Sequence, residues 1–157
     1  MVQIEEFKQA AGKFPTGVCV ITTSFNDLLW GFTANSFVSV SLVPPLVSFC
    51  LNKEAGSFRA FSSSKYFSIN ILASDQQEIA KRFAHSLPDK FANVDYKLGT
   101  ESKTPLITGA TSFIECRKIK EFECGDHFIF VGEVLQINIE KTKSPLLYFA
   151  KSYREMK

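Results

Sequence analysis

The chain has 157 residues, about the size of one ordinary domain, and 45% of them are hydrophobic, which is enough to bury a core. It has 18 Lys and Arg against 16 Asp and Glu, scattered with no block of one sign, for a formal net charge of +2. This balance gives no reason to expect a nucleic-acid or membrane partner. We expect a single domain over residues 1–157.

The N-terminal segment lacks the basic and apolar regions of a secretory signal. No run of the chain approaches the roughly 20 apolar residues that span a bilayer, so we expect a cytoplasmic protein. The four cysteines lack the close C-x-x-C spacing of zinc and redox sites and are predicted to be free thiols. They are Cys19, Cys50, Cys116 and Cys124.

The first predicted element is a short amphipathic helix, because apolar residues recur at helical spacing before Pro15 stops the pattern. These residues are Ile4, Phe7, Ala11 and Phe14. A second short helix is expected over 56–64. A third is expected from Ser74 to about His85, with Ser74 as N-cap and Gln77 completing a capping box.

The remaining periodic segments predict strands, since β-branched and aromatic residues alternate with polar ones between turn residues. They cover 18–23, 28–32, 35–42, 46–51, 66–73, 111–120, 127–140 and 146–149. A turn is expected over 123–126, and 86–109 is predicted to be irregular, forming a flap over a site. Many strands without regular βα alternation favour an antiparallel barrel, so the fold class is mainly β.

The motifs of the commonest enzyme classes are absent from the sequence. It contains no G-x-G-x-x-G, G-x-x-x-x-G-K-[ST], H-E-x-x-H or G-x-S-x-G. With only His85 and His127, a histidine-rich metal site is excluded. Nothing near the cysteines supports a papain-like Cys/His pair.

One stretch, residues 31–52, has a pattern suited to ligand binding. Small hydroxyl and amide residues lie beside apolar ones across two strands and a Pro-Pro turn. Small side chains let a flat ligand approach backbone groups, and Thr33, Asn35 and Ser36 offer further hydrogen bonds. The alternative is that these Ser and Thr residues only cover the solvent face of two strands.

Several further segments accompany this stretch in order along the chain: 15–18, 57–58, 67–73, 80–83, the Gly125-Asp126-His127 turn with its strand to 134, and 145–149. Together they resemble the flavin reductase-like family, short reductases that supply reduced flavin to two-component monooxygenases. The resemblance implies an antiparallel, Greek-key-like split β-barrel of the FMN-binding type with a few short flanking helices. It also implies a homodimer with the flavin near the subunit interface.

The resemblance further implies which residues contact the flavin, FMN or FAD. Those implied for the isoalloxazine and ribityl chain are Thr33, Ala34, Asn35 and Ser36. Those implied for main-chain contacts are Ser39, Val40 and Ser41, and those implied to face the same groove are Cys50, Leu51 and Asn52. Those implied for the phosphate or its surroundings are Lys53, Ser57, Phe58 and Arg82. Lys53 could equally be a solvated loop lysine, and Arg82 an exposed helical arginine.

Two more residues complete the implied site. Tyr153 corresponds to an aromatic residue near the flavin, although the glycines usual before it are replaced by Ala150-Lys151-Ser152. His127 is implied to orient the nicotinamide, as the catalytic residue of hydride transfer from NADH or NADPH to flavin; a histidine in such a turn is otherwise structural. The cofactors carry this chemistry themselves, so no strong general base is required.

Two other functions are alternatives to a reductase. The first is a flavin carrier of the same fold without nicotinamide-dependent turnover, and the sequence does not exclude it. A nucleic-acid-binding barrel is suggested by the 16 phenylalanines but lacks the Lys/Arg stripe that phosphate tracking requires. The sequence therefore predicts a flavin reductase with a monooxygenase as a further partner, and no metal.

Overall fold

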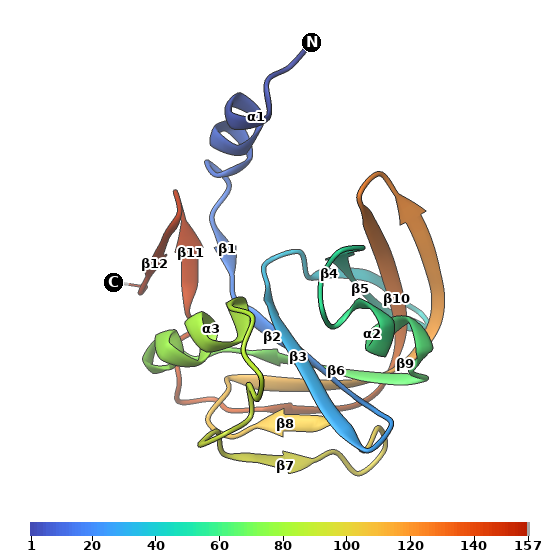
Figure 1. Cartoon of the computed structure of the whole chain (residues 1–157). Coiled ribbons are helices and arrows are strands. Elements are labelled where there is room, and N and C mark those ends of the chain that lie inside the picture. Colours follow the sequence, from blue (N-terminus) through green and yellow to red (C-terminus); the bar gives the residue numbers. More distant parts are fainter. Residues whose placement is uncertain (157) are drawn as a thin grey trace.

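A computed structural model describes residues 1–156 of the chain, and Figure 1 shows that strands dominate it. Seven strands form one antiparallel sheet in the order β3-β2-β6-β9-β10-β5-β4. Their bounds are β2 Cys19–Phe25, β3 Leu28–Ala34, β4 Val38–Leu42, β5 Pro45–Asn52, β6 Tyr66–Ile71, β9 Ser112–Cys124 and β10 His127–Ile139. Within residues 1–156 the end strands β3 and β4 do not pair, so the sheet does not close into a complete barrel.

Two smaller sheets flank this one. β1 (Thr16–Gly17), β11 (Leu147–Phe149) and β12 (Ser152–Arg154) form the first; β7 (Tyr96–Leu98) and β8 (Pro105–Ile107) form a hairpin. The hairpin is fastened to the large sheet because Thr22 Oγ1 donates to the Pro105 carbonyl at 2.6 Å. The Ile107 N–H in turn donates to Asn70 Oδ1 at 2.8 Å.

Three α-helices complete the fold: α1 (Ile4–Ala11), α2 (Phe58–Ser63) and α3 (Gln77–Ala84). The predicted cap of the third helix is wrong. A 3₁₀ turn, η1 (Ser74–Gln76), precedes α3, and Gln76 Oε1 accepts the Ala73 N–H at 3.0 Å. Gln76 Nε2 also donates to the Thr108 carbonyl at 2.9 Å, so a tertiary contact holds the residue that immediately precedes α3.

The core lies on both faces of β2, because alternate residues of a strand point to opposite sides. Cys19 and Ile21 pack inside the curved sheet, whereas Val18 and Val20 pack toward α3. Inside the sheet, the Phe49 ring stacks on Phe130 with centroids 5.1 Å apart. Burial of these apolar residues stabilises the folded sheet.

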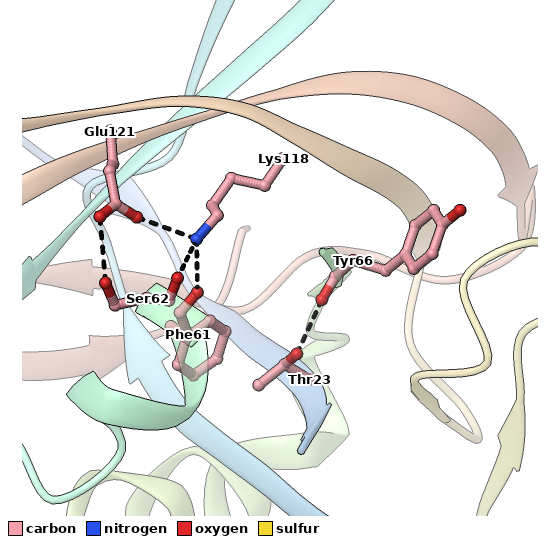
Figure 2. Close-up of polar contacts among 6 residues, drawn as sticks. All are labelled: Thr23, Phe61, Ser62, Tyr66, Lys118 and Glu121. Atoms are coloured by element: carbon pink, nitrogen blue, oxygen red, sulfur yellow. Dashed lines mark hydrogen bonds and ion pairs between the residues drawn. The ribbon is translucent and has the colours of Figure 1, made fainter. Parts of the chain in front are cut away.

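The helix α2 is attached to β9 by Lys118, as Figure 2 shows. Lys118 Nζ donates to the carbonyls of Phe61, at 3.1 Å, and Ser62, and pairs with Glu121 at 2.9 Å. Glu121 accepts a further hydrogen bond from Ser62 Oγ at 3.0 Å. A cation at a helix C-terminus satisfies carbonyls that lack intrahelical partners, so Lys118 holds α2 over one end of the sheet.

The sequence-based expectations are confirmed for the fold class, which is mainly β and antiparallel with short helices. The prediction of a strand over 35–42 is wrong at its start, because the ladder begins only at Val38. The predicted irregular segment 86–109 contains the β7–β8 hairpin. All four cysteines are free, and no helix within residues 1–156 is long and apolar enough to cross a membrane.

Candidate functional site

A groove of about 1010 Å³ runs along the outer edge of β3, which pairs with β2 on its other side. In Figure 1, β3 lies between α3 on one side and α2 on the other. One wall of the groove comes from the end of β5, the turn before α2 and His127. The opposite wall comes from the end of α3 and residues 85–92. The groove therefore exists where the large sheet stays open.

The first wall is held by Ser36, whose side chain takes the place of a neighbouring strand. Ser36 Oγ accepts the Cys50 N–H at 2.9 Å and donates to the Cys50 carbonyl at 3.3 Å. Nearby, Thr33 Oγ1 donates to the Ala80 carbonyl at 2.6 Å and so joins β3 to α3. These two hydroxyls are used to position backbone, which leaves main-chain groups and small side chains to face the groove.

The turn between β5 and α2 continues this wall. Asn52 Oδ1 accepts the Glu54 N–H at 2.7 Å, which shapes the turn locally. Ser57, the residue before α2, is buried and lines the groove, and its side chain makes no capping bond to the helix. The Ser57 hydroxyl is thus a polar group that lines the groove.

His127 lies at the start of β10, opposite Asn52 of β5 and Cys124 of β9. Its Nδ1 is 2.7 Å from Asp126 Oδ1, a contact that fixes the orientation of the ring. The hydrogen bond and charge of His127 lower the pKa of Asp126. The His127 ring is partly exposed and lines the groove, with Nε2 left for other contacts.

The opposite wall is a short loop tied down at several points. Arg82 Nε donates to the Lys90 carbonyl at 2.7 Å, and Arg82 Nη2 donates to the Asp89 carbonyl at 3.0 Å. Asp89 Oδ1 accepts the N–H groups of Phe91, at 3.0 Å, and Ala92, at 3.2 Å. The loop is therefore a defined part of the site.

Lys90 crosses from this loop to the edge of β3. Its Nζ donates to the Gly31 carbonyl at 3.1 Å and to the Phe83 carbonyl at 3.0 Å. Burial lowers the pKa of Lys90. β3 and α3 approach closely here, since a Cβ on Gly31 would lie 2.9 Å from the Phe83 ring.

Most of the residues predicted from the sequence come together in this groove. Those that line it are Thr33, Ala34, Asn35, Ser36, Cys50, Leu51, Asn52, Ser57 and His127. Tyr153 lines a second cavity of about 180 Å³ that shares Thr33, Ala34 and Asn35 with the groove. The residues that line neither cavity are Ser39, Val40, Ser41, Lys53, Phe58 and Arg82.

The structure shows where several of these last residues are engaged. Lys53 pairs with Glu123 and lies over the Phe128 ring at 5.9 Å. Phe58 packs edge-on against Phe128 with centroids 5.0 Å apart, and both rings are partly buried against the core. Residues 39–41 belong to β4, at the far end of the sheet from β3.

Trp30 and Lys90 are among the groove residues that were not predicted from the sequence. Trp30 lines the groove, and its Nε1 is buried with no hydrogen-bond partner among residues 1–156. Lys90 lies within the segment 86–109 that was predicted to form a flap over a site, but it was not named as a site residue. Residues 86–92 of that segment line the groove. No local pattern marks a single lysine between Asp89 and Phe91 as a groove residue, because its position depends on carbonyls of β3 and α3.

The groove lining is suited to an organic ligand. Within residues 1–156, no group of three or more His, Cys, Asp and Glu side chains is placed to hold a metal ion. Its lining instead combines a strand edge, small side chains and a few polar groups, which is typical of sites for flat organic ligands.

A model of the flavin reductase like domain matches residues 11–157. The chain belongs to the flavin reductase-like family. It is 39% identical over 153 residues to an NADH-dependent FAD reductase of Streptomyces globisporus, covering 95% of this chain and 84% of that protein. It is 37% identical over 149 residues to HsaB, the reductase subunit of a flavin-dependent monooxygenase from Mycobacterium tuberculosis, covering 94% and 79% respectively.

Solved structures of family members share the fold over nearly the whole chain. The Streptomyces globisporus NADH:FAD oxidoreductase SgcE6, in complex with NAD and FAD fragments, is 36% identical with a TM-score of 0.94, covering 100% of this chain and 96% of that one. Flavin reductase PheA2 in its native state is 37% identical with a TM-score of 0.90, covering 99% of each chain.

Proposed function

We propose that this flavin reductase family member uses NADH to reduce FMN or FAD and supplies the reduced flavin to a monooxygenase. The observation that carries the proposal is the groove along β3, in which nine of the residues implied for flavin and nicotinamide contacts meet. Relatives that are reductase components of flavin-dependent monooxygenases support the partner.

The groove suits a flavin in size and chemistry. Its volume of about 1010 Å³ is at the upper end of the roughly 300–1,000 Å³ usual for small-molecule sites. Gly31, Ala34 and Ser36 are small enough to let a flat ring approach the strand edge.

The residues of the groove divide into two roles. Thr33 to Ser36 and Cys50 to Asn52 would hold the ring and ribityl chain, and the adjacent cavity brings Tyr153 to the same segment. When bound, the flavin would supply the redox chemistry as the acceptor of a hydride from the dihydronicotinamide. His127, oriented by Asp126, would position the nicotinamide at the open end of the groove.

We also propose that the protein is a homodimer, on account of α1. This helix has only eight residues and none of them is buried, while Ile4 and Phe7 are 71% and 65% exposed. Figure 1 shows it projecting from the sheets. An isolated helix shorter than about 12–15 residues is marginal in water, so α1 requires a covering surface, which a second copy would supply. Light scattering during gel filtration tests this: a monomer would contradict it.

The central experiment follows the oxidation of NADH by the purified protein with and without added FMN or FAD. We expect flavin-dependent oxidation, with NADPH as the comparison donor. His127→Ala is expected to raise the KM for NADH while flavin affinity, measured by fluorescence quenching, stays unchanged. Flavin binding without NADH oxidation would instead indicate a flavin carrier, and no flavin binding would overturn the proposal altogether.

A further inference from the structure

A cation in the groove would balance the negative charge of a flavin nucleotide's phosphate ester, but the two cations implied by the resemblance, Lys53 and Arg82, do not line the groove. Lys53 pairs with Glu123 outside the groove. The Arg82 guanidinium donates to the carbonyls of residues 89 and 90. Of the described residues that line the groove, Lys90 is the one Lys or Arg.

Lys90 is held in position by neutral groups. Its Nζ donates to the carbonyls of Gly31 and Phe83, which accounts for two of the three N–H donors of an ammonium. Within residues 1–156 it forms no ion pair with a carboxylate. The nearest acid in sequence, Asp89, is occupied by the N–H groups of residues 91 and 92.

This arrangement leaves a half-buried charge without a counter-ion. Burial disfavours the charged form of a side chain, whereas an opposite charge within hydrogen-bond distance favours that form. Charge-assisted hydrogen bonds are roughly twice as strong as neutral ones. Because two carbonyls already fix the ammonium, an arriving anion meets a preorganised donor and loses little affinity to side-chain ordering.

We propose that the third N–H of Lys90 binds the phosphate ester of the flavin nucleotide and makes the site select FMN and FAD over riboflavin. This inference rests on the proposed function, since it names the group that recognises the substrate of the same groove. The pyrophosphate of NADH has the same chemistry and is the alternative source of the anion, so the experiment separates the two.

The experiment measures dissociation constants for riboflavin, FMN and FAD by fluorescence quenching in the absence of NADH. Lys90→Met is compared with wild type, with Lys90→Arg, which keeps the charge, and with Lys141→Met, which removes an exposed charge outside the groove. We expect Lys90→Met to weaken FMN and FAD binding about 10- to 100-fold and riboflavin binding about twofold or less. Lys90→Arg and Lys141→Met should retain the preference for phosphorylated flavins.

Three results would contradict phosphate binding by Lys90, and each has a different meaning. Equal weakening of riboflavin and FMN by Lys90→Met would make Lys90 a purely structural link between the loop and β3. Unchanged flavin affinities with a raised KM for NADH would assign the anion to the nicotinamide nucleotide. Wild-type protein that binds no flavin would refute the proposed function itself.

A measurement on the wild-type protein keeps the inference testable where Lys90→Met fails to fold. Added salt screens interactions between charged groups. The affinity for FMN should therefore fall with salt concentration more steeply than the affinity for riboflavin. Identical salt dependence for the two flavins would contradict an ion pair with the phosphate.

Discussion

Replacement of Ser36 by alanine tests how the groove wall is built. Cys50 lies opposite Ile129 of β10, and β4 pairs with β5 only as far as Ser48. The Cys50 N–H and carbonyl on that side therefore extend beyond β4, and Ser36 Oγ satisfies both. Ser36→Ala removes this partner and leaves the Cys50 backbone with water alone.

An unsatisfied buried polar group costs about 1–3 kcal/mol. Cys50 is half-buried, so water offsets part of the loss and we expect about 1 kcal/mol, at the lower end of that range. This corresponds to about 2–4 °C in Tm for a chain of this size. Urea unfolding gives the free energy, and fluorescence quenching gives the flavin dissociation constant, which should rise as residues 35–37 lose their attachment.

Ser36→Thr is the matched control, because it keeps a hydroxyl at the same position. It should restore most of the stability and flavin affinity lost in Ser36→Ala. If Ser36→Ala had wild-type stability and wild-type flavin affinity, the segment would be held by other contacts and the reasoning would be refuted.

Three further predictions concern the core and the mouth of the groove. Burial raises the pKa of Cys19 from 9.0 to about 12, so the thiol stabilises the fold below pH 9.0 and this contribution is lost as pH rises toward about 12. Between these pH values Cys19 makes the wild-type free energy of unfolding fall by up to about 1.4 kcal/mol per pH unit. Cys19→Ala should remove this part of the fall, which urea unfolding at several pH values measures. Gly132→Ala would place a Cβ 2.4 Å from the Phe67 ring, so it should lower the free energy of unfolding by about 1–3 kcal/mol in the same assay. Gly56→Ala is the control: it has open space around it and should lower the free energy of unfolding by less than about 1 kcal/mol. Asp126→Asn should raise the KM for NADH without changing flavin affinity, because the His127 ring loses its anionic partner; an unchanged KM would contradict the positioning role.

Local patterning accounts for most of the fold. Alternation over 45–52 places one face in the core, and the β-branched run in 19–25 is buried on both faces, so strands there follow from the sequence itself. The errors occur where tertiary contacts replace local signals. Residues 35–37 alternate like a strand, yet Ser36 bonds to Cys50 and the ladder starts later. The N-terminal start of α3 shifts likewise, because Gln76 bonds to Thr108 across the fold.

The site was predictable in part for a related reason. Residues 33–36 and 50–52 are close in sequence to a turn between paired strands, so their meeting follows from the hairpin. The opposite wall follows from no such pairing. Lys90 reaches Gly31 across 59 positions of the chain, and only the docking of α3 beside β3 brings the two together. The resemblance implies Lys53 and Arg82 for the phosphate; in the structure Lys53 pairs with Glu123 and Arg82 donates to the Asp89 carbonyl.

The open edge of β3 links these observations. A strand at the end of a sheet exposes unpaired N–H and carbonyl groups, which proteins normally cover. Here the edge is partly covered by Lys90 on the Gly31 carbonyl, and Gly31 has no side chain to keep α3 and its loop away. The same edge that leaves the barrel incomplete is therefore the surface against which a flat ligand can lie, so closure of the sheet through β3 and β4 would remove the site.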